Sequence, residues 1–189
     1  MTGRVDFPAP LRISGRFTRR WSGDDLPKLS NTRVGDLTHP TFQRPGHLLR
    51  RCHQIAVALF LDECQAHDLT PPQFATLSAL SAHGPLDKAT LGGIAALDRT
   101  TVAVVLKNLQ ERGLVVCTAS PTDRRATLNQ ISPEGQATLD AVQPAVDKAQ
   151  ERMLAPLNPA ERAVFSMLLA KIADANNMLS RAPQRTPRR

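Results

Sequence analysis

The side chains best suited to chemistry gather between residues 99 and 125, where hydroxyl, amide and basic groups follow one another closely. Thr100 and Thr101 would open a helix, where hydroxyls can donate to phosphates and threonine methyls can contact thymine methyls. An ordinary solvent-facing helix can carry the same residue types, but as a set they favour DNA. On this helix we expect DNA contacts from Arg99, Thr100, Thr101, Lys107 and Asn108.

A second group of charged residues follows within a polar loop, at Asp123, Arg124 and Arg125. Asp123 and Arg125 are two residues apart, so their charges can pair across a turn and hold the loop in shape. Arg124 would then point elsewhere and meet a phosphate or a narrow minor groove. We expect all three residues to belong to a DNA-binding site.

Enzymatic chemistry finds little support in the sequence. A phosphate-binding glycine loop, H-E-x-x-H and G-x-S-x-G are all absent, and the five histidines are not spaced as metal ligands. The three cysteines, Cys52, Cys64 and Cys117, are odd in number and lack C-x-x-C spacing, which argues against a disulfide framework or a zinc site. We therefore expect no enzyme, no catalytic residue, no metal and no cofactor.

Residues 46–67 show an apolar stripe at helical spacing with polar groups beside it. His47, Arg51, His53 and Phe60 form a mixture suited to an anionic group on an apolar body, and we predict that they bind a small-molecule effector. Histidines on a helix are nevertheless more often surface residues or hydrogen-bonded core residues.

Oxidant is the alternative effector. Cys52 and Cys64 lie on the same expected helix, and Arg51 or His53 could lower a thiol pKa as a thiolate sensor requires. Burial of cysteine as a small apolar side chain is the commoner case.

Capping patterns define the helices that precede the polar loop. Thr70-Pro71-Pro72-Gln73 is a capping box with proline at the first helical position, and it begins a helix that stops at Gly84-Pro85. Asp87 caps a short third helix, and Asp98 caps a fourth over residues 99–112. The residues expected on the buried sides of the second and fourth helices are Phe74, Leu77, Leu80, Ser81, Val102, Val105, Leu106 and Leu109.

After Gly113 the apolar period changes to that of strands, so residues 114–118 and 126–131 are predicted to form a β hairpin. Ser132-Pro133 then opens a long helix with a kink expected at Pro144, and a cap at 158–161 begins a last helix that reaches residue 179. The order α-α-α-α-β-β-α-α is mainly α and predicts a winged helix-turn-helix, with the fourth helix in the major groove and the hairpin as the wing.

The formal net charge of +7 is unevenly distributed along the chain. Residues 1–45 hold eight Lys/Arg against four Asp/Glu, residues 181–189 hold four Arg, and residues 46–180 carry a net charge of −1. We interpret 1–45 as a basic, flexible arm and 181–189 as a basic tail, although charged termini are common whatever the function. Because no apolar stretch suits a bilayer or a signal peptide, we expect a cytoplasmic protein without a membrane partner.

Four stretches of the chain resemble the MarR family of bacterial transcription regulators. They read L-D-R-T-T-V, L-Q-E-R-G-L-V, P-T-D-R-R-A and I-S-P-E-G at residues 97–102, 109–115, 121–126 and 131–135. The D-x-R pattern of the wing is the most specific part, and the helix order matches over residues 46–180.

The resemblance implies an obligate homodimer joined through residues 46–68 and 136–180, with a DNA-binding head over 70–135. Such a dimer binds double-stranded DNA at a pseudo-palindromic operator and usually represses. The first helix also resembles that of regulators of aromatic-acid breakdown, so we expect release by a small aromatic acid or its coenzyme A thioester. A protein-interaction module that does not bind DNA is the less favoured alternative.

The chain departs from the family pattern at several positions. Val104 and Asn108 stand where basic residues are frequent, and Ile131 and Ser132 conservatively replace the usual Leu and Thr. The peroxide-sensing branch of the family uses tyrosines to hold its cysteine, and this chain has none, which ranks redox sensing second.

Overall fold

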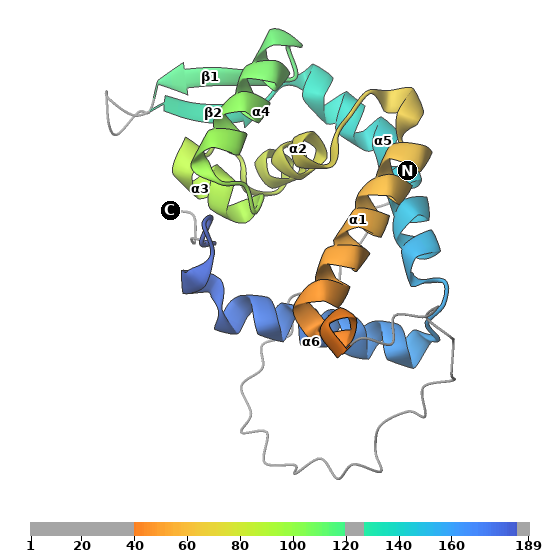
Figure 1. Cartoon of the computed structure of the whole chain (residues 1–189). Helices are drawn as coiled ribbons and strands as arrows, with labels where there is room; N and C mark the ends of the chain where they lie inside the picture. Colours follow the sequence, from red (N-terminus) through yellow and green to blue (C-terminus); the bar gives the residue numbers. More distant parts are fainter. Residues whose placement is uncertain (1–39, 120–126, 185–189) are drawn as a thin grey trace. The chain divides into compact units, whose positions relative to one another are not determined.

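The computed structural model describes residues 40–119 and 127–184 (Figure 1). Within them the predicted order of helices and strands is confirmed. The elements are η2 (Pro40–Gln43), α1 (Pro45–Glu63), η3 (Gln65–His67), α2 (Pro71–His83), α3 (Lys88–Ile94), α4 (Arg99–Glu111), β1 (Val115–Ala119), β2 (Thr127–Ile131), α5 (Pro133–Leu154), α6 (Pro159–Ala175) and η4 (Asn177–Leu179), where η marks a short 3-10 helix.

Helices α2, α3 and α4 and the β hairpin surround one apolar core. The apolar side of α4 is buried as predicted, with Val102, Val105, Leu106 and Leu109 all less than 10% exposed. Leu77 and Leu80 of α2 and Leu91 of α3 are fully buried beside them. The burial of three helices against each other fixes which face of α4 points to solvent.

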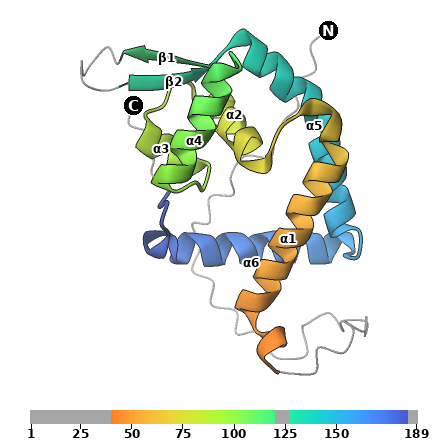
Figure 2. The ribbon, with the colours of Figure 1, turned by 45° about the horizontal axis from the view of Figure 1, so that its top comes forward.

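The hairpin is antiparallel, with Val115 opposite Ile131 and Ala119 opposite Thr127. Residue 86, in the link between α2 and α3, pairs with β2 through two backbone bonds: Leu86 N–H to Asn129 O at 3.0 Å and Asn129 N–H to Leu86 O at 2.8 Å. Figure 2 shows the hairpin beside α4 and α3, and this extra pairing holds the middle of β2 against the link between α2 and α3.

Two aspartates begin α3 and α4 in the same way. Asp87 accepts hydrogen bonds from the backbone N–H groups of Ala89 and Thr90, and its other oxygen accepts from the Thr90 hydroxyl at 2.6 Å. Partial burial alone would raise the pKa of Asp87, but these hydrogen bonds outweigh it and the pKa lies below its ordinary value. The charged carboxylate therefore stabilises the helix start.

The long helix α5 packs along α1 in both views (Figures 1 and 2). Ion pairs join the two at the end of α1: Lys148 Nζ lies 2.8 Å from Glu63, and Arg152 contacts both Asp62 and Glu63. Hydrogen bonds from Lys148 and Arg152 lower the pKa of Glu63. Pro144 lies within the continuous range of α5 and does not end it.

Three local predictions were wrong in detail. The first helix ends at Glu63, and its expected last turn is the 3-10 segment η3, which ends at Asp68 in a left-handed conformation with φ 48°. The last helix ends at Ala175, and residues 177–179 form η4. Ser81 is exposed and donates its hydroxyl to Gln136 at 2.8 Å, although it shares the helical spacing of Leu77.

In the described residues, no single helix is long and apolar enough to cross a membrane. One pair, α3 with α4, passes that test on length and composition only when taken together, and it is bent by 103°. Most of the predicted arm, 1–45, and of the tail, 181–189, lies outside the described residues.

Gly135 in α5 lies too close to its neighbours for a larger residue. A Cβ at this position would lie 2.1 Å from the backbone O of Leu114 and 2.9 Å from Ile131 Cγ1. We expect Gly135→Ala to lower the free energy of unfolding by about 1–3 kcal/mol, since a backbone oxygen cannot move aside cheaply. Chemical denaturation measures this. The matched control is Gly46→Ala in α1, where a Cβ meets nothing within 4 Å and the change should be stabilising by less than about 1 kcal/mol. Equal stability of the two variants would contradict the close approach.

Candidate nucleic-acid interface

The bend between α3 and α4 is a helix-turn-helix. The two helices meet at 103°, within the range of about 90–120° found in such motifs. A Cβ added at Gly92 would lie 2.9 Å from Leu97 O and 3.5 Å from Val102 Cγ1, so α3 and the start of α4 approach closely. Ala96 completes the turn with a positive φ of 54°. The outward face of α4 thereby has a fixed orientation on the head.

The predicted DNA-contacting residues of α4 lie mostly on that outward face. Arg99, Thr100, Lys107 and Asn108 are exposed, and Thr101 is half-buried. Lys107 pairs with Glu111 one turn along the helix, at 3.7 Å, and both side chains remain largely in solvent. Such an exposed pair holds the lysine only weakly, so a phosphate can compete for it.

The first turn of α4 is occupied by its own cap. Asp98 Oδ1 accepts from the N–H groups of Thr100 and Thr101 at 2.9 and 3.0 Å, and Oδ2 accepts from the Thr101 hydroxyl at 2.8 Å. The hydrogen bonds from Thr101 hold the pKa of Asp98 below its ordinary value. Because the carboxylate stays charged here, Thr101 donates inward, and the exposed Thr100 and Arg99 are the groups that face solvent at this end.

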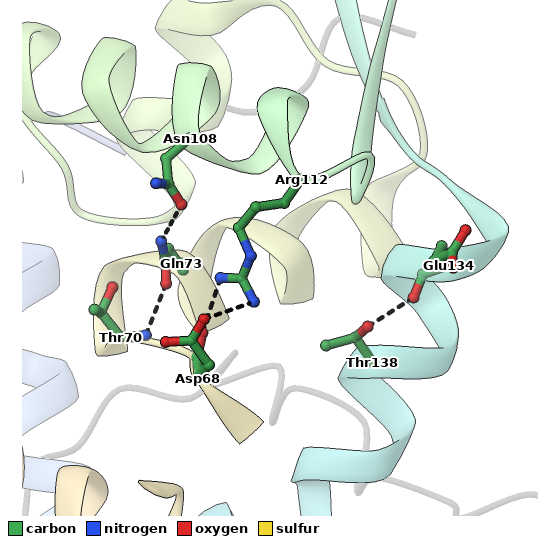
Figure 3. Close-up of polar contacts among 7 residues, drawn as sticks. All are labelled: Asp68, Thr70, Gln73, Asn108, Arg112, Glu134 and Thr138. Carbon is green, nitrogen blue, oxygen red and sulfur yellow. Dashed lines mark hydrogen bonds and ion pairs between the residues drawn. The ribbon is translucent and has the colours of Figure 1, made fainter. Parts of the chain in front are cut away.

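Asn108 makes a contact that the sequence did not predict. Its Oδ1 accepts from Nε2 of Gln73 at 2.5 Å, and Gln73 is buried at the start of α2 (Figure 3). The sequence predicts Gln73 only as the last member of the capping box, and that box is present in the structure. Gln73 and Asn108 are 35 residues apart in the sequence, so no local sequence pattern indicates their contact.

Arg112 makes a second unpredicted contact from the end of α4. Its guanidinium donates to the backbone O of Asp68 at 2.8 Å and lies 3.4 Å from the Asp68 carboxylate (Figure 3). Asp68 lies just before α2, and Gln73 lies in its first turn. Helix α4 is therefore tied to the start of α2 at two points, one turn of α4 apart.

The predicted wing residues Asp123, Arg124 and Arg125 lie outside the described residues, and the strands that lead to them are held by hydrogen bonds to the helices. Gln110 of α4 donates to Asn129 Oδ1 at 3.2 Å, and the buried Asn129 donates to Leu86 O at 3.3 Å. These bonds tie β2 to α4 and fix the position at which the wing leaves the head.

The predicted effector residues do not share one face of α1. His47 is half-buried, with its ring 5.1 Å from that of Phe42, and the exposed Arg51 lies one turn further on the same side. His53 is exposed on another side of the helix. Phe60 is buried against Phe74 at 5.8 Å, and it lies 13 residues, or about 20 Å, along the helix from His47. Within one chain, His47 and Arg51 therefore lie close together on α1, and Phe60 lies far along the helix from them.

The cysteines differ in exposure. Burial, with a smaller effect of the Glu63 charge, raises the pKa of the Cys64 thiol, which is the opposite of what a thiolate sensor requires. Cys52 is half-buried and Cys117 is exposed on β1. Among the described residues, no group of His, Cys, Asp and Glu could hold a metal ion.

Comparisons with known proteins agree with this geometry. A family model described as "MarR family" matches residues 67–126. The HTH-type transcriptional repressor NicR of Pseudomonas putida is 33% identical over 78% of this chain and 93% of its own length. The structure of Bordetella bronchiseptica BpsR, whose DNA binding is regulated by 6-hydroxynicotinic acid, is 33% identical with a TM-score of 0.69 and covers 72% of this chain and 97% of its own.

A third relative is PcaV of Streptomyces coelicolor, a transcriptional regulator solved with its natural ligand. It is 36% identical, has a TM-score of 0.63, and covers 70% of this chain and 93% of its own. The helix-turn-helix, the hairpin beside it and these similarities together show that the chain belongs to the MarR family of DNA-binding transcription regulators, which are not enzymes.

Proposed function

We propose that this protein is a homodimeric, cytoplasmic repressor that binds a pseudo-palindromic operator and is released by a small aromatic acid. The observation that carries the DNA-binding part is the outward face of α4. Its apolar side is enclosed in the core, so Arg99, Thr100, Lys107 and Asn108 are held outward on a helix-turn-helix. A helix presented in this way fits the major groove.

Repression and the effector class are proposed from the relatives. NicR is named a repressor, and the DNA binding of BpsR is regulated by an aromatic acid, 6-hydroxynicotinic acid. On this chain, the imidazole of His47 lies beside the ring of Phe42, and Arg51 follows one turn along α1 on the same side. A cation next to apolar and aromatic groups suits an aromatic carboxylate. The coenzyme A thioester and an oxidant are the alternative effectors, and the release experiment below tests them together with the aromatic carboxylate.

The dimer is proposed from the surface of α6. This helix has no buried residue in the single chain, although its sequence is rich in large apolar side chains. Exposed apolar surface of this extent in a small domain marks an association site. The exposed large apolar residues of α6 and η4 are Val164, Met167, Leu168, Ile172, Met178 and Leu179, and those of α1 are Leu48, Leu49, Ile55 and Leu61.

Charges placed on this surface should break the dimer. We expect Leu168→Glu/Ile172→Glu to elute as a monomer in size-exclusion chromatography with light scattering, because both carboxylates would be buried without partners. The matched control is Ala170→Glu, which is exposed on the opposite side of the same helix and should remain dimeric. A wild-type monomer, or a double variant that stays dimeric, would contradict the proposal.

The length of DNA that the protein protects is the first test of operator binding. We expect the wild type to protect an inverted repeat of roughly 16–20 base pairs, because two heads must reach major grooves about one helical turn apart.

The wing arginines provide the second test of DNA binding. Arg124→Ala/Arg125→Ala should weaken operator binding and reduce the slope of log K against log salt by about one for each phosphate that the wing no longer neutralises. Arg50→Ala in α1 removes a positive charge outside the head and should leave the slope unchanged. An unchanged slope in the wing variant would count against the wing as a DNA-binding element.

The effector is identified by release from DNA. We expect 6-hydroxynicotinic acid or another aromatic carboxylate in a panel to release the wild type, with the coenzyme A thioesters and peroxide as parallel arms. Arg51→Ala should bind operator normally but require at least about tenfold more acid for release, because the ion pair with the carboxylate can no longer form. The matched control is Arg50→Ala, which removes another exposed arginine from the neighbouring position of α1. Release by peroxide alone would favour the redox alternative, and equal responses of the two variants would exclude Arg51 from the site.

A further inference from the structure

Two hydrogen bonds in series orient the side-chain amide of Asn108. The backbone N–H of Thr70 donates to Oε1 of Gln73 at 2.9 Å, and Nε2 of Gln73 donates to Oδ1 of Asn108 at 2.5 Å. A backbone N–H can only donate, so it must meet the oxygen of the Gln73 amide. The nitrogen of Gln73 is then directed at Asn108 and must meet an acceptor. The direction of the first bond therefore fixes which end of the Asn108 amide faces Gln73.

The amide nitrogen of Asn108 consequently lies on the side away from Gln73, as Figure 3 shows. Gln73 is 9% exposed and is held in place by the capping box, whereas Asn108 is exposed on the outward face of α4. The buried glutamine is the fixed partner in this pair. The group that the pair presents to solvent is the NH₂ donor of Asn108.

We infer that Gln73 is a specificity-determining residue that acts through Asn108, by making this asparagine a hydrogen-bond donor toward DNA. This inference rests on the proposed operator binding by α4. An asparagine that recognises adenine uses both ends of its amide: the oxygen accepts from the N6 amino group, and the nitrogen donates to N7. Here the oxygen is engaged with Gln73. Asn108 therefore contacts an acceptor on DNA, which is either a base atom such as O6 or N7 of guanine and O4 of thymine, or a phosphate oxygen.

Gln73→Glu reverses the presented group without removing the cap. Glutamate is as good as glutamine at the last position of a capping box, so α2 keeps its start. Its carboxylate accepts from Thr70 and can only accept from Asn108 as well. The Asn108 amide must then turn its nitrogen inward, and its oxygen faces DNA. Asn108→Asp produces a similar reversal from the exposed side, because one carboxylate oxygen accepts from Gln73 and the other faces outward.

The experiment selects bound DNA from a pool of duplexes randomised over more than two helical turns. It uses the full-length wild type, Gln73→Glu, Asn108→Asp, Asn108→Ala and the double variant Gln73→Glu/Asn108→Ala, and thermal melting confirms that each is folded. We expect both Gln73→Glu and Asn108→Asp to bind the wild-type consensus on the order of tenfold more weakly. In both variants residue 108 presents an oxygen instead of an NH₂ group to the acceptor on DNA, so the hydrogen bond is lost. The Gln73→Glu effect should disappear in the Asn108→Ala background.

The two acceptor sources give different selected sequences. If Asn108 contacts a base, Gln73→Glu shifts one position of each half-site toward adenine or cytosine, which offer amino donors. If it contacts a phosphate, affinity falls equally for all sequences and the consensus is unchanged.

The inference is overturned if Gln73→Glu binds the wild-type consensus as tightly as the wild type does. It is equally overturned if the weaker binding of Gln73→Glu persists when residue 108 is alanine, since the added charge would then act without Asn108. Failure of the wild type to enrich any duplex would instead remove the proposed operator binding, and the inference with it.

Discussion

The burial of one side of α4 is the constraint on which the rest of the head depends. Val102, Val105, Leu106 and Leu109 are enclosed by α2, α3 and the hairpin, and the exposure of Leu109 is 0%. Rotating α4 by a quarter turn would expose these side chains at a cost of about 1.5–3 kcal/mol each. The polar side of α4 therefore faces solvent because the apolar side can be buried in only one orientation of the helix. Any DNA contact made by α4 inherits its geometry from this apolar packing.

Most of the fold follows from patterns that are local in sequence. The caps at Asp87, Asp98 and Ser132 each accept from backbone N–H groups two or three residues ahead, so a short stretch of sequence contains the whole interaction. Helix ends are less predictable where apolar residues continue at helical spacing beyond the last residue of the helix. Cys64 is buried and continues the stripe of α1, yet it lies after the last residue of the helix, because a side chain at a helix end can be buried as fully as one within the helix.

The candidate site was predictable in its residue types but not in its hydrogen bonds. The exposed face of α4 follows from helical periodicity, whereas the link from Gln73 to Asn108 depends on two helices being packed together. The bond from the Thr101 hydroxyl to Asp98 is local by contrast, because it belongs to the cap at the start of α4. The packing of Phe60 against Phe74 of α2 depends on helix packing in the same way, and helical periodicity alone does not reveal it. A neighbour from elsewhere in the chain can hold a side chain of the right type, and it then decides which atoms of that side chain remain free to bind.

The cap at Asp98 also bears on how phosphates are bound. A helix N-terminus attracts anions through its free N–H groups and its dipole, but here a charged carboxylate already occupies the first turn of α4. A phosphate near this end must be held by side chains such as Arg99 and Thr100. Residues 46–180 have a net charge of −1, and 12 of the 24 Lys/Arg lie in residues 1–45 and 181–189. Sequence-independent attraction to DNA is therefore expected to come from the ends of the chain, while α4 and the wing discriminate between sites.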